Sequence, residues 1–232
     1  MTLLVRTNLL LAGLIVGMIS QGTAAPAENW RNYRLAVMQT VVEVAVPYAR
    51  LHELSVRHWQ IPYRAVSLEW IYSGKGPQVQ AFDASFHFKG PFWRGNYGMI
   101  IFNGFVNKKP EWFKGDLFDM VALKEMVERQ TKSAVQQVSD SFYFEVVTIN
   151  GVPWMHRCDY DPKSPLPGAR MGKKDTYMRP LTGDLYIHVT IDLVQGMIAE
   201  KLDWLKEAEL LRERLKNSLV IKYPAGPPSA AK

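Results

Sequence analysis

The chain has 232 residues, of which 47% are hydrophobic and 22% charged, with a formal net charge of +6 and one cysteine. These proportions are ordinary for a globular protein, and the length is enough for one domain with a substantial core. One cysteine excludes an internal disulfide. Because the positive charge is spread along the chain, the composition does not favour nucleic-acid binding, whereas weak attraction to an acidic wall or membrane surface is consistent with it.

The N-terminal segment has the pattern of a secretory signal peptide. One arginine precedes the apolar run LLLAGLIVGMIS, and small residues follow at Ala25-Pro26-Ala27. The apolar run is shorter than the ~20 residues of a membrane span. We therefore predict a signal peptide over residues 1–27, cleaved before Glu28 or, alternatively, after Ala24; an uncleaved N-terminal anchor is the competing interpretation. The mature chain would be periplasmic or secreted, without a transmembrane span.

The first half of the mature chain predicts short strands and one short helix. The β-branched residues of TVVEVAV predict a strand within Leu35–Val46, and Tyr48–Trp59 predicts a short helix that Pro62 stops. Apolar and polar residues then alternate in Ala65–Tyr72 and in Gln80–Phe88, as in half-buried strands. We expect these two strands to pair as a hairpin.

Two amphipathic helices are predicted in the second half. The first begins after Asp116, whose carboxylate can cap it, and ends near Ser139; the second covers about Met197–Asn217 and carries apolar residues on one face. Between them, Asp161–Gly183 is rich in proline, glycine and basic residues, which predicts a long functional or mobile loop. Leu185–Leu193 alternates as a strand.

The segment Ser141–Tyr160 predicts a hairpin around the turn Asn150-Gly151. Both central positions of such a turn need positive φ, which asparagine and glycine adopt readily. The turn sets a register in which Glu145 faces His156 on one face of the hairpin. We expect this hairpin to form the centre of the fold.

Together these elements predict one α+β domain over residues 28–223, with a mostly antiparallel sheet and two long helices packed against it, and a disordered tail at 224–232. The second half, from about Gly115 to Tyr223, resembles the PsbP/Mog1-like proteins, a group with periplasmic members. The resemblance rests on a helix, the hairpin FYFEVVTINGVPWMHRCDY, a basic loop, the strand LYIHVTIDL and a long amphipathic helix. It implies a non-enzymatic accessory or assembly factor.

Candidate catalytic residues lie in the hairpin. His156 and Cys158 share one strand face, with Cα atoms ~7 Å apart, and Glu145 faces His156. Cysteine, histidine and a carboxylate are the components of a nucleophilic site. The preferred interpretation is a packed thiol beside a histidine–glutamate pair, with catalysis as the alternative. The histidines are scattered without metal-ligand spacing, so the sequence predicts no metal site and no cofactor.

Aromatic and basic residues in loops are the preferred candidates for a binding surface. Exposed rings beside basic side chains suit sugars, peptides, lipid headgroups or a protein partner; alternatively, the rings fold back as lids on the sheet. The predicted contact residues lie in segments 90–98 and 107–115 and in the basic loop: Phe92, Trp93, Arg94, Tyr97, Trp112, Phe113, Arg170, Lys173 and Lys174.

The sequence therefore favours an exported, non-enzymatic binding or accessory protein whose aromatic and basic loops contact an envelope protein or a cell-wall or surface polymer. Two alternatives stay open. One is an envelope hydrolase or thiol enzyme built around Glu145, His156 and Cys158, and the other is an immunity-type inhibitor that acts by binding alone.

Overall fold

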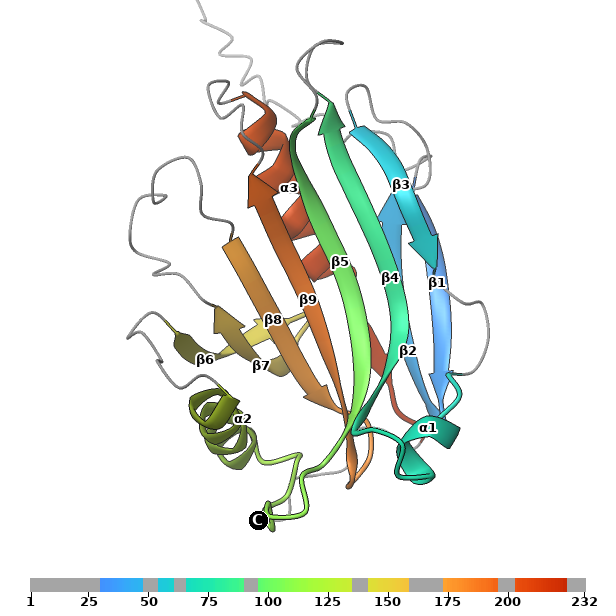
Figure 1. Ribbon diagram of the computed structural model, residues 1–232, viewed down its shortest axis with the longest axis vertical. Coiled ribbons are helices and arrows are strands. Elements are labelled where there is room, and N and C mark those ends of the chain that lie inside the picture. Colours follow the sequence, from blue (N-terminus) through green and yellow to red (C-terminus); the bar gives the residue numbers. More distant parts are fainter. Residues whose placement is uncertain are drawn as a thin grey trace, which may run out of the picture.

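The computed structural model describes residues 30–47, 54–60, 66–89, 96–134, 142–158, 173–195 and 203–224 (Figure 1). The predicted signal peptide lies outside these ranges, as does the predicted tail beyond Pro224. The elements in chain order are β1 (Trp30–Val37), β2 (Thr40–Pro47), β3 (Leu54–Gln60), α1 (Glu69–Tyr72), β4 (Gln78–Lys89), β5 (Asn96–Lys108), α2 (Met120–Ala134), β6 (Tyr143–Ile149), β7 (Val152–Cys158), β8 (Lys173–Pro180), β9 (Leu185–Gln195), α3 (Asp203–Asn217) and β10 (Val220–Lys222).

The larger of two sheets has seven strands in the order β3-β4-β5-β9-β8-β7-β6, and each neighbouring pair is antiparallel. The long strands β5 and β9 form its middle (Figure 1). Apolar residues occupy every second position of β9 from Leu185 to Leu193. Since successive side chains of a strand point to opposite faces of a sheet, these residues all point to the same face. The fully buried face of β9 carries Leu185, Ile187, Val189, Ile191 and Leu193.

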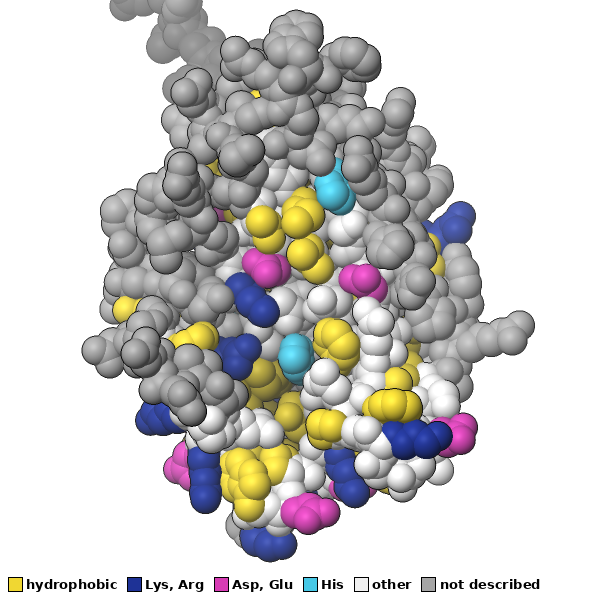
Figure 2. Space-filling view, in the orientation of Figure 1, with side chains coloured by type: hydrophobic (Ala, Val, Ile, Leu, Met, Phe, Trp, Pro, Cys, Tyr) yellow, Lys and Arg dark blue, Asp and Glu magenta, His cyan; other side chains and the backbone are white. Residues whose placement is uncertain are grey.

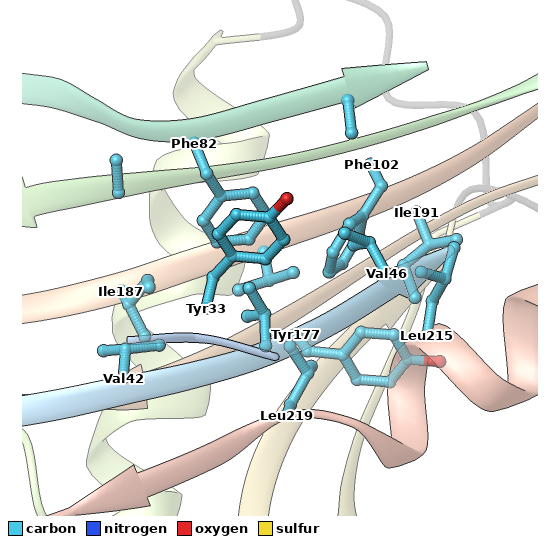
Figure 3. Close-up of a cluster of buried hydrophobic side chains, with 14 of the residues drawn as sticks. Tyr33, Val42, Val46, Phe82, Phe102, Tyr177, Ile187, Ile191, Leu215 and Leu219 are labelled. Atoms are coloured by element: carbon cyan, nitrogen blue, oxygen red, sulfur yellow. The ribbon is translucent and has the colours of Figure 1, made fainter. Parts of the chain in front are cut away.

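The smaller sheet, in the order β1-β2-β10, packs against one face of the larger sheet. Figure 3 shows Tyr33 and Val42 of the small sheet in the same apolar cluster as Phe82 and Phe102 of the large sheet and Leu215 of α3. The rings of Phe82 and Phe102 lie 4.9 Å apart between centroids. Burial of this apolar surface between the two sheets and α3 is the main source of stability.

Helix α2 covers part of the opposite face of the large sheet. Its residues Leu123 and Met126 pack in a second apolar cluster with Met155 of β7 and Met178 of β8. Asp119 starts the helix, since its Oδ1 accepts hydrogen bonds from the backbone N–H groups of the second and third residues after it. The two faces of the sheet therefore have separate cores, one with α3 and one with α2.

The predicted fold, a mostly antiparallel sheet with two long helices, is wrong in its proportions. The described chain is mostly strand, in two antiparallel sheets, and its helices are short: α1 has 4 residues, while α2 and α3 have 15 each. Helix α2 begins later than predicted because Asp119 caps it instead of Asp116, whose Oδ1 accepts from the backbone N–H of Phe118 in the preceding turn. Helix α3 begins at Asp203, with residues 196–202 outside the described ranges.

In the first half, one strand prediction is confirmed and two other predictions are wrong. The strand predicted from TVVEVAV within Leu35–Val46 is β2, and β1 pairs with it across a turn in which Met38 has φ of 54°. The predicted helix Tyr48–Trp59 contains strand β3, which pairs with β4. The predicted strand Ala65–Tyr72 is absent from the described residues 66–72, where Glu69–Tyr72 forms the short helix α1, and β4 pairs with β3 and β5 instead of with this segment. Alternation misled here, because Trp70 of the apolar set is half exposed while Ile71 is buried.

The register predicted for the hairpin is confirmed, but its predicted place is wrong. Glu145 pairs with His156, and Asn150 and Gly151 have φ values of 51° and 76°. However, β6 is the outermost strand of the large sheet rather than its centre. Pro153 cannot donate to a third strand, and the pairing between β7 and β8 runs only from Met155 to Cys158.

The predicted basic loop also contains a strand. Lys173–Pro180 forms β8, between β7 and β9, whereas residues 159–172 lie outside the described ranges. The sequence did not indicate this strand, because its first two residues are lysines that continue the basic character of the predicted loop. Its later residues, from Asp175 onward, are all buried, and they bring a carboxylate next to the hairpin.

Candidate functional site

A pocket of about 320 Å³ lies between the β6–β7 hairpin, β8 and the outer turns of α3. Its deep side chains include His156 and Asp175, whereas the side chains of Glu145 and Glu213 are 55% and 61% exposed and lie nearer to solvent. Charged residues of both signs and a few apolar ones line it: Glu145, Val147, Thr148, Ile149, His156, Lys173, Asp175, Tyr177, Glu209, Arg212, Glu213 and Lys216.

His156 is held between two carboxylates. Its Nδ1 lies 3.0 Å from Oε1 of Glu145 on β6, and its Nε2 lies 2.9 Å from Oδ1 of Asp175 on β8. The ring of Tyr177 stacks on the imidazole with a centroid distance of 4.7 Å and an interplanar angle of 10°. Three neighbouring strands therefore fix both the position and the plane of this imidazole.

The polar network continues from Asp175 into helix α3. Arg212 pairs with Oδ2 of Asp175, and both side chains are buried. The same guanidinium donates to Oε2 of Glu209 at 2.6 Å, and Lys173 donates to Oε1 of Glu209 at 2.9 Å. Paired in this way, the buried charges avoid most of the free energy that an isolated charge would cost.

Burial lowers the pKa of His156 below its ordinary value of 6.5, while the hydrogen bond to Glu145 acts in the opposite direction. A neutral imidazole donates only one hydrogen bond. Both ring nitrogens face carboxylate oxygens, so a neutral imidazole can donate a hydrogen bond to only one of Glu145 and Asp175 at a time.

Cys158 lies beside this histidine and is almost completely buried, with 1% exposure. It is paired with Asp175 across β7 and β8. One ligand-type atom from each of Cys158, His156 and Asp175 lies within 4.8 Å of the other two. The sequence predicted the Glu145–His156–Cys158 group, and the structure brings all three residues to one place, but the thiol is packed in the protein interior.

The predicted contact residues that lie within the described ranges have different surroundings. Tyr97 is buried and stacks on Trp204 of α3, with ring centroids 6.4 Å apart. Phe113 is also buried, whereas Trp112 is 42% exposed with the guanidinium of Arg129 over its ring at 4.4 Å. The remaining ones divide as follows: Lys173 lines the pocket, Lys174 lies next to it on β8, and Phe92, Trp93, Arg94 and Arg170 lie outside the described residues.

Sequence reasoning missed Asp175, Arg212 and Glu209. Asp175 lies in the segment predicted as a loop, and the two helical residues are not part of the apolar face predicted for the second helix. A signal was present for Arg212, since it lies four residues after the buried Ala208 and next to the buried Leu211. An arginine within the apolar stripe of a helix predicts a buried ionic partner.

A second pocket of about 280 Å³ lies on the other face of the sheet, between α2 and strands β4, β5, β7, β8 and β9. Figure 2 shows this side of the molecule, with histidine, basic, acidic and apolar side chains close together. His188 lines the pocket, and burial, with the nearby cations Arg157 and Lys174, lowers its pKa to about 4. This histidine is therefore neutral at neutral pH.

None of the helices in the described ranges combines the length and apolar character that crossing a membrane requires. No family model matches the chain, and no curated protein matches it in sequence. The chain has a structural similarity to the crystal structure of LpqN, involved in cell envelope biogenesis of Mycobacterium tuberculosis, with 9% identity, a TM-score of 0.40 and coverage of 83% of this chain and 91% of that chain. This similarity is too low to assign a function, and the PsbP/Mog1-like resemblance stays a prediction.

Proposed function

We propose that this chain is an exported, non-enzymatic binding protein of the cell envelope, and that it binds a polar, charged ligand in the pocket between β6–β8 and α3. The observation that carries the proposal is the pocket wall. Glu145, Glu213, Lys173 and Lys216 present charges of both signs around one opening, while the buried Asp175–Arg212 pair fixes the wall behind them. Groups held in place before binding lose little conformational entropy when a ligand arrives.

The lining suits a ligand that carries both hydrogen-bond donors and acceptors. The exposed carboxylates of Glu145 and Glu213 can accept from ammonium or hydroxyl groups, and the ammonium groups of Lys173 and Lys216 can donate to carboxylate or phosphate. Apolar side chains such as Val147 can contact the carbon skeleton of the ligand. This combination is typical of the amino-acid, amino-sugar and headgroup chemistry of envelope components.

The thiol-enzyme alternative is less well supported, because a nucleophilic cysteine has to reach its substrate. Cys158 is 1% exposed and does not line the pocket. The proposal of export rests on the apolar run and the small residues at Ala25-Pro26-Ala27. N-terminal sequencing of envelope material should begin at Glu28, or at Ala25 if the alternative site is cleaved; an intact Met1 in that fraction contradicts processing.

Native mass spectrometry of the full chain, incubated with the soluble envelope extract of its producing cells, tests the pocket. We expect a small-molecule adduct that is lost in Glu213→Gln/Lys216→Met, which removes the pair at the pocket wall without changing the net charge. The matched control is Lys124→Met/Glu128→Gln, which removes a comparable helical pair on α2. An adduct that survives in the first variant, or is lost equally in both, contradicts this location.

A further inference from the structure

His156, Cys158 and Asp175 bring three different metal-ligand atoms together next to the pocket. His156 and Cys158 are two residues apart on one face of β7, and Asp175 pairs with Cys158 from β8. Their ligand atoms lie within 4.8 Å of one another, and all three residues are buried. The arrangement needs no loop closure, since two hydrogen-bonded strands set the spacing.

We propose that these three residues bind a divalent transition-metal ion of the zinc class. A thiolate, an imidazole and a carboxylate form a mixed sulfur, nitrogen and oxygen set, which suits zinc and its borderline neighbours and does not suit magnesium or calcium. Metal–ligand bonds of ~2.0–2.3 Å place tetrahedral ligands roughly 3–4 Å apart. The three ligand atoms lie within 4.8 Å of one another, and small rotations of the side chains bring them to the separation that a bound metal requires.

The neighbours of the three ligands provide a second observation that points to a metal. Glu145 faces Nδ1 of His156 at 3.0 Å, so Nδ1–H can donate to this carboxylate while Nε2 faces Asp175. Arg212 pairs with Oδ2 of Asp175 and leaves Oδ1 toward the histidine. Outer carboxylates that fix the tautomer of a ligating histidine are a regular feature of zinc sites.

The charges around the proposed site also balance. A thiolate at Cys158 and the carboxylates of Asp175 and Glu145 contribute three negative charges, and Arg212 contributes one positive charge. A divalent cation therefore brings this group to neutrality. It offsets the buried charges of Cys158 and Asp175, whereas Glu145 is 55% exposed and remains partly solvated. Because His156 and Asp175 line the pocket, a water molecule entering from it can supply a fourth ligand.

Cobalt substitution tests the proposal on the full chain, because Co²⁺ reports its ligands by absorption. We expect one equivalent of Co²⁺ to give the visible bands of a tetrahedral site together with a near-ultraviolet sulfur-to-cobalt charge-transfer band, and Zn²⁺ to displace both. Cys158→Ser, which is nearly isosteric, should abolish the charge-transfer band. Glu145→Gln should keep the band and weaken Co²⁺ binding by roughly 10–100-fold, as for other outer carboxylates.

The control is His188→Gln, which removes a histidine on the opposite face of the sheet and should leave cobalt binding unchanged. Circular dichroism of each variant separates lost binding from lost folding, and cadmium-113 NMR of the unmodified chain gives a readout that needs no variant. A folded wild-type chain with no charge-transfer band and no bound-cadmium signal overturns the proposal. So does a charge-transfer band that persists in Cys158→Ser. Neither outcome depends on whether an envelope ligand binds in the pocket.

Discussion

Arg212 of α3 and Asp175 of β8 form an ion pair in which both side chains are buried, with 7% and 5% exposure. This pair connects the helix to the seven-stranded sheet at the wall of the pocket. It also orients Asp175 toward His156, whose Nε2 lies 2.9 Å from the other carboxylate oxygen. Stability and site geometry therefore depend on the same contact.

Arg212→Met should lower the free energy of unfolding by ~3–5 kcal/mol, because it leaves Asp175 buried without its cationic partner. Urea unfolding at neutral pH, with a chelator present to remove any metal, measures the change. The double variant Arg212→Met/Asp175→Asn is the control, and it should recover part of the loss because it removes the uncompensated charge. A single variant within about 1 kcal/mol of wild type would contradict a stabilising role for the pair.

Gly151→Val should cost ~1–3 kcal/mol, because Gly151 has φ of 76° and a β-branched residue resists positive φ. The hairpin lies at the edge of the large sheet, so the domain should still fold cooperatively. Gly183→Val is the matched control: Gly183 is exposed, its φ is not in the positive range, and an added Cβ has no neighbour within 4 Å. Equal unfolding free energies for the two variants would show that the turn conformation contributes nothing.

The pKa of His188, lowered from 6.5 to about 4, predicts a loss of stability in mild acid. Above pH 6.5 this histidine is neutral in both the folded and the unfolded chain, so its contribution is fully present there. As the pH falls toward 4, the unfolded chain binds the proton first, and the folded state loses on the order of 2 kcal/mol between about pH 7.5 and pH 5. Urea unfolding at both pH values measures this loss.

The control for this prediction is His188→Gln, which cannot titrate. The difference in unfolding free energy between the two pH values should be smaller in this variant than in wild type by about the same 2 kcal/mol. The same pH dependence in both proteins would assign the acid sensitivity to other groups.

Tyr97→Ala should destabilise the domain by ~3–5 kcal/mol, because the ring is buried against Trp204 and its removal leaves a cavity. Trp112→Ala should cost about 1 kcal/mol or less, since Trp112 is 42% exposed and loses mainly its contact with Arg129. Thermal unfolding of the two variants side by side measures the difference. If the order were reversed, Trp112 would be the ring that covers the core.

The sequence by itself determined the local features of this protein. The Asn150-Gly151 turn fixed the pairing of Glu145 with His156, because positive φ is a property of single residues and a two-residue loop permits one register. The alternation in Leu185–Leu193 identified a strand of the sheet for the same reason, since burial on one face follows a period of two. The start of α2 was not determined, because Asp116 and Asp119 are both good capping residues, and β1 was not determined, because no strong turn residue marks the turn at Met38.

Only the tertiary structure decided which strands lie in the middle of the sheet and which residues share the pocket. Strand order depends on pairings between segments far apart in the chain, such as β5 with β9, and these leave no local pattern. Asp175 and Arg212 are 37 residues apart, and neither forms a motif with His156 in the sequence. Their meeting follows from β8 pairing with β7 while α3 packs on the same face, so the candidate site exists only once the sheet and the helix are assembled.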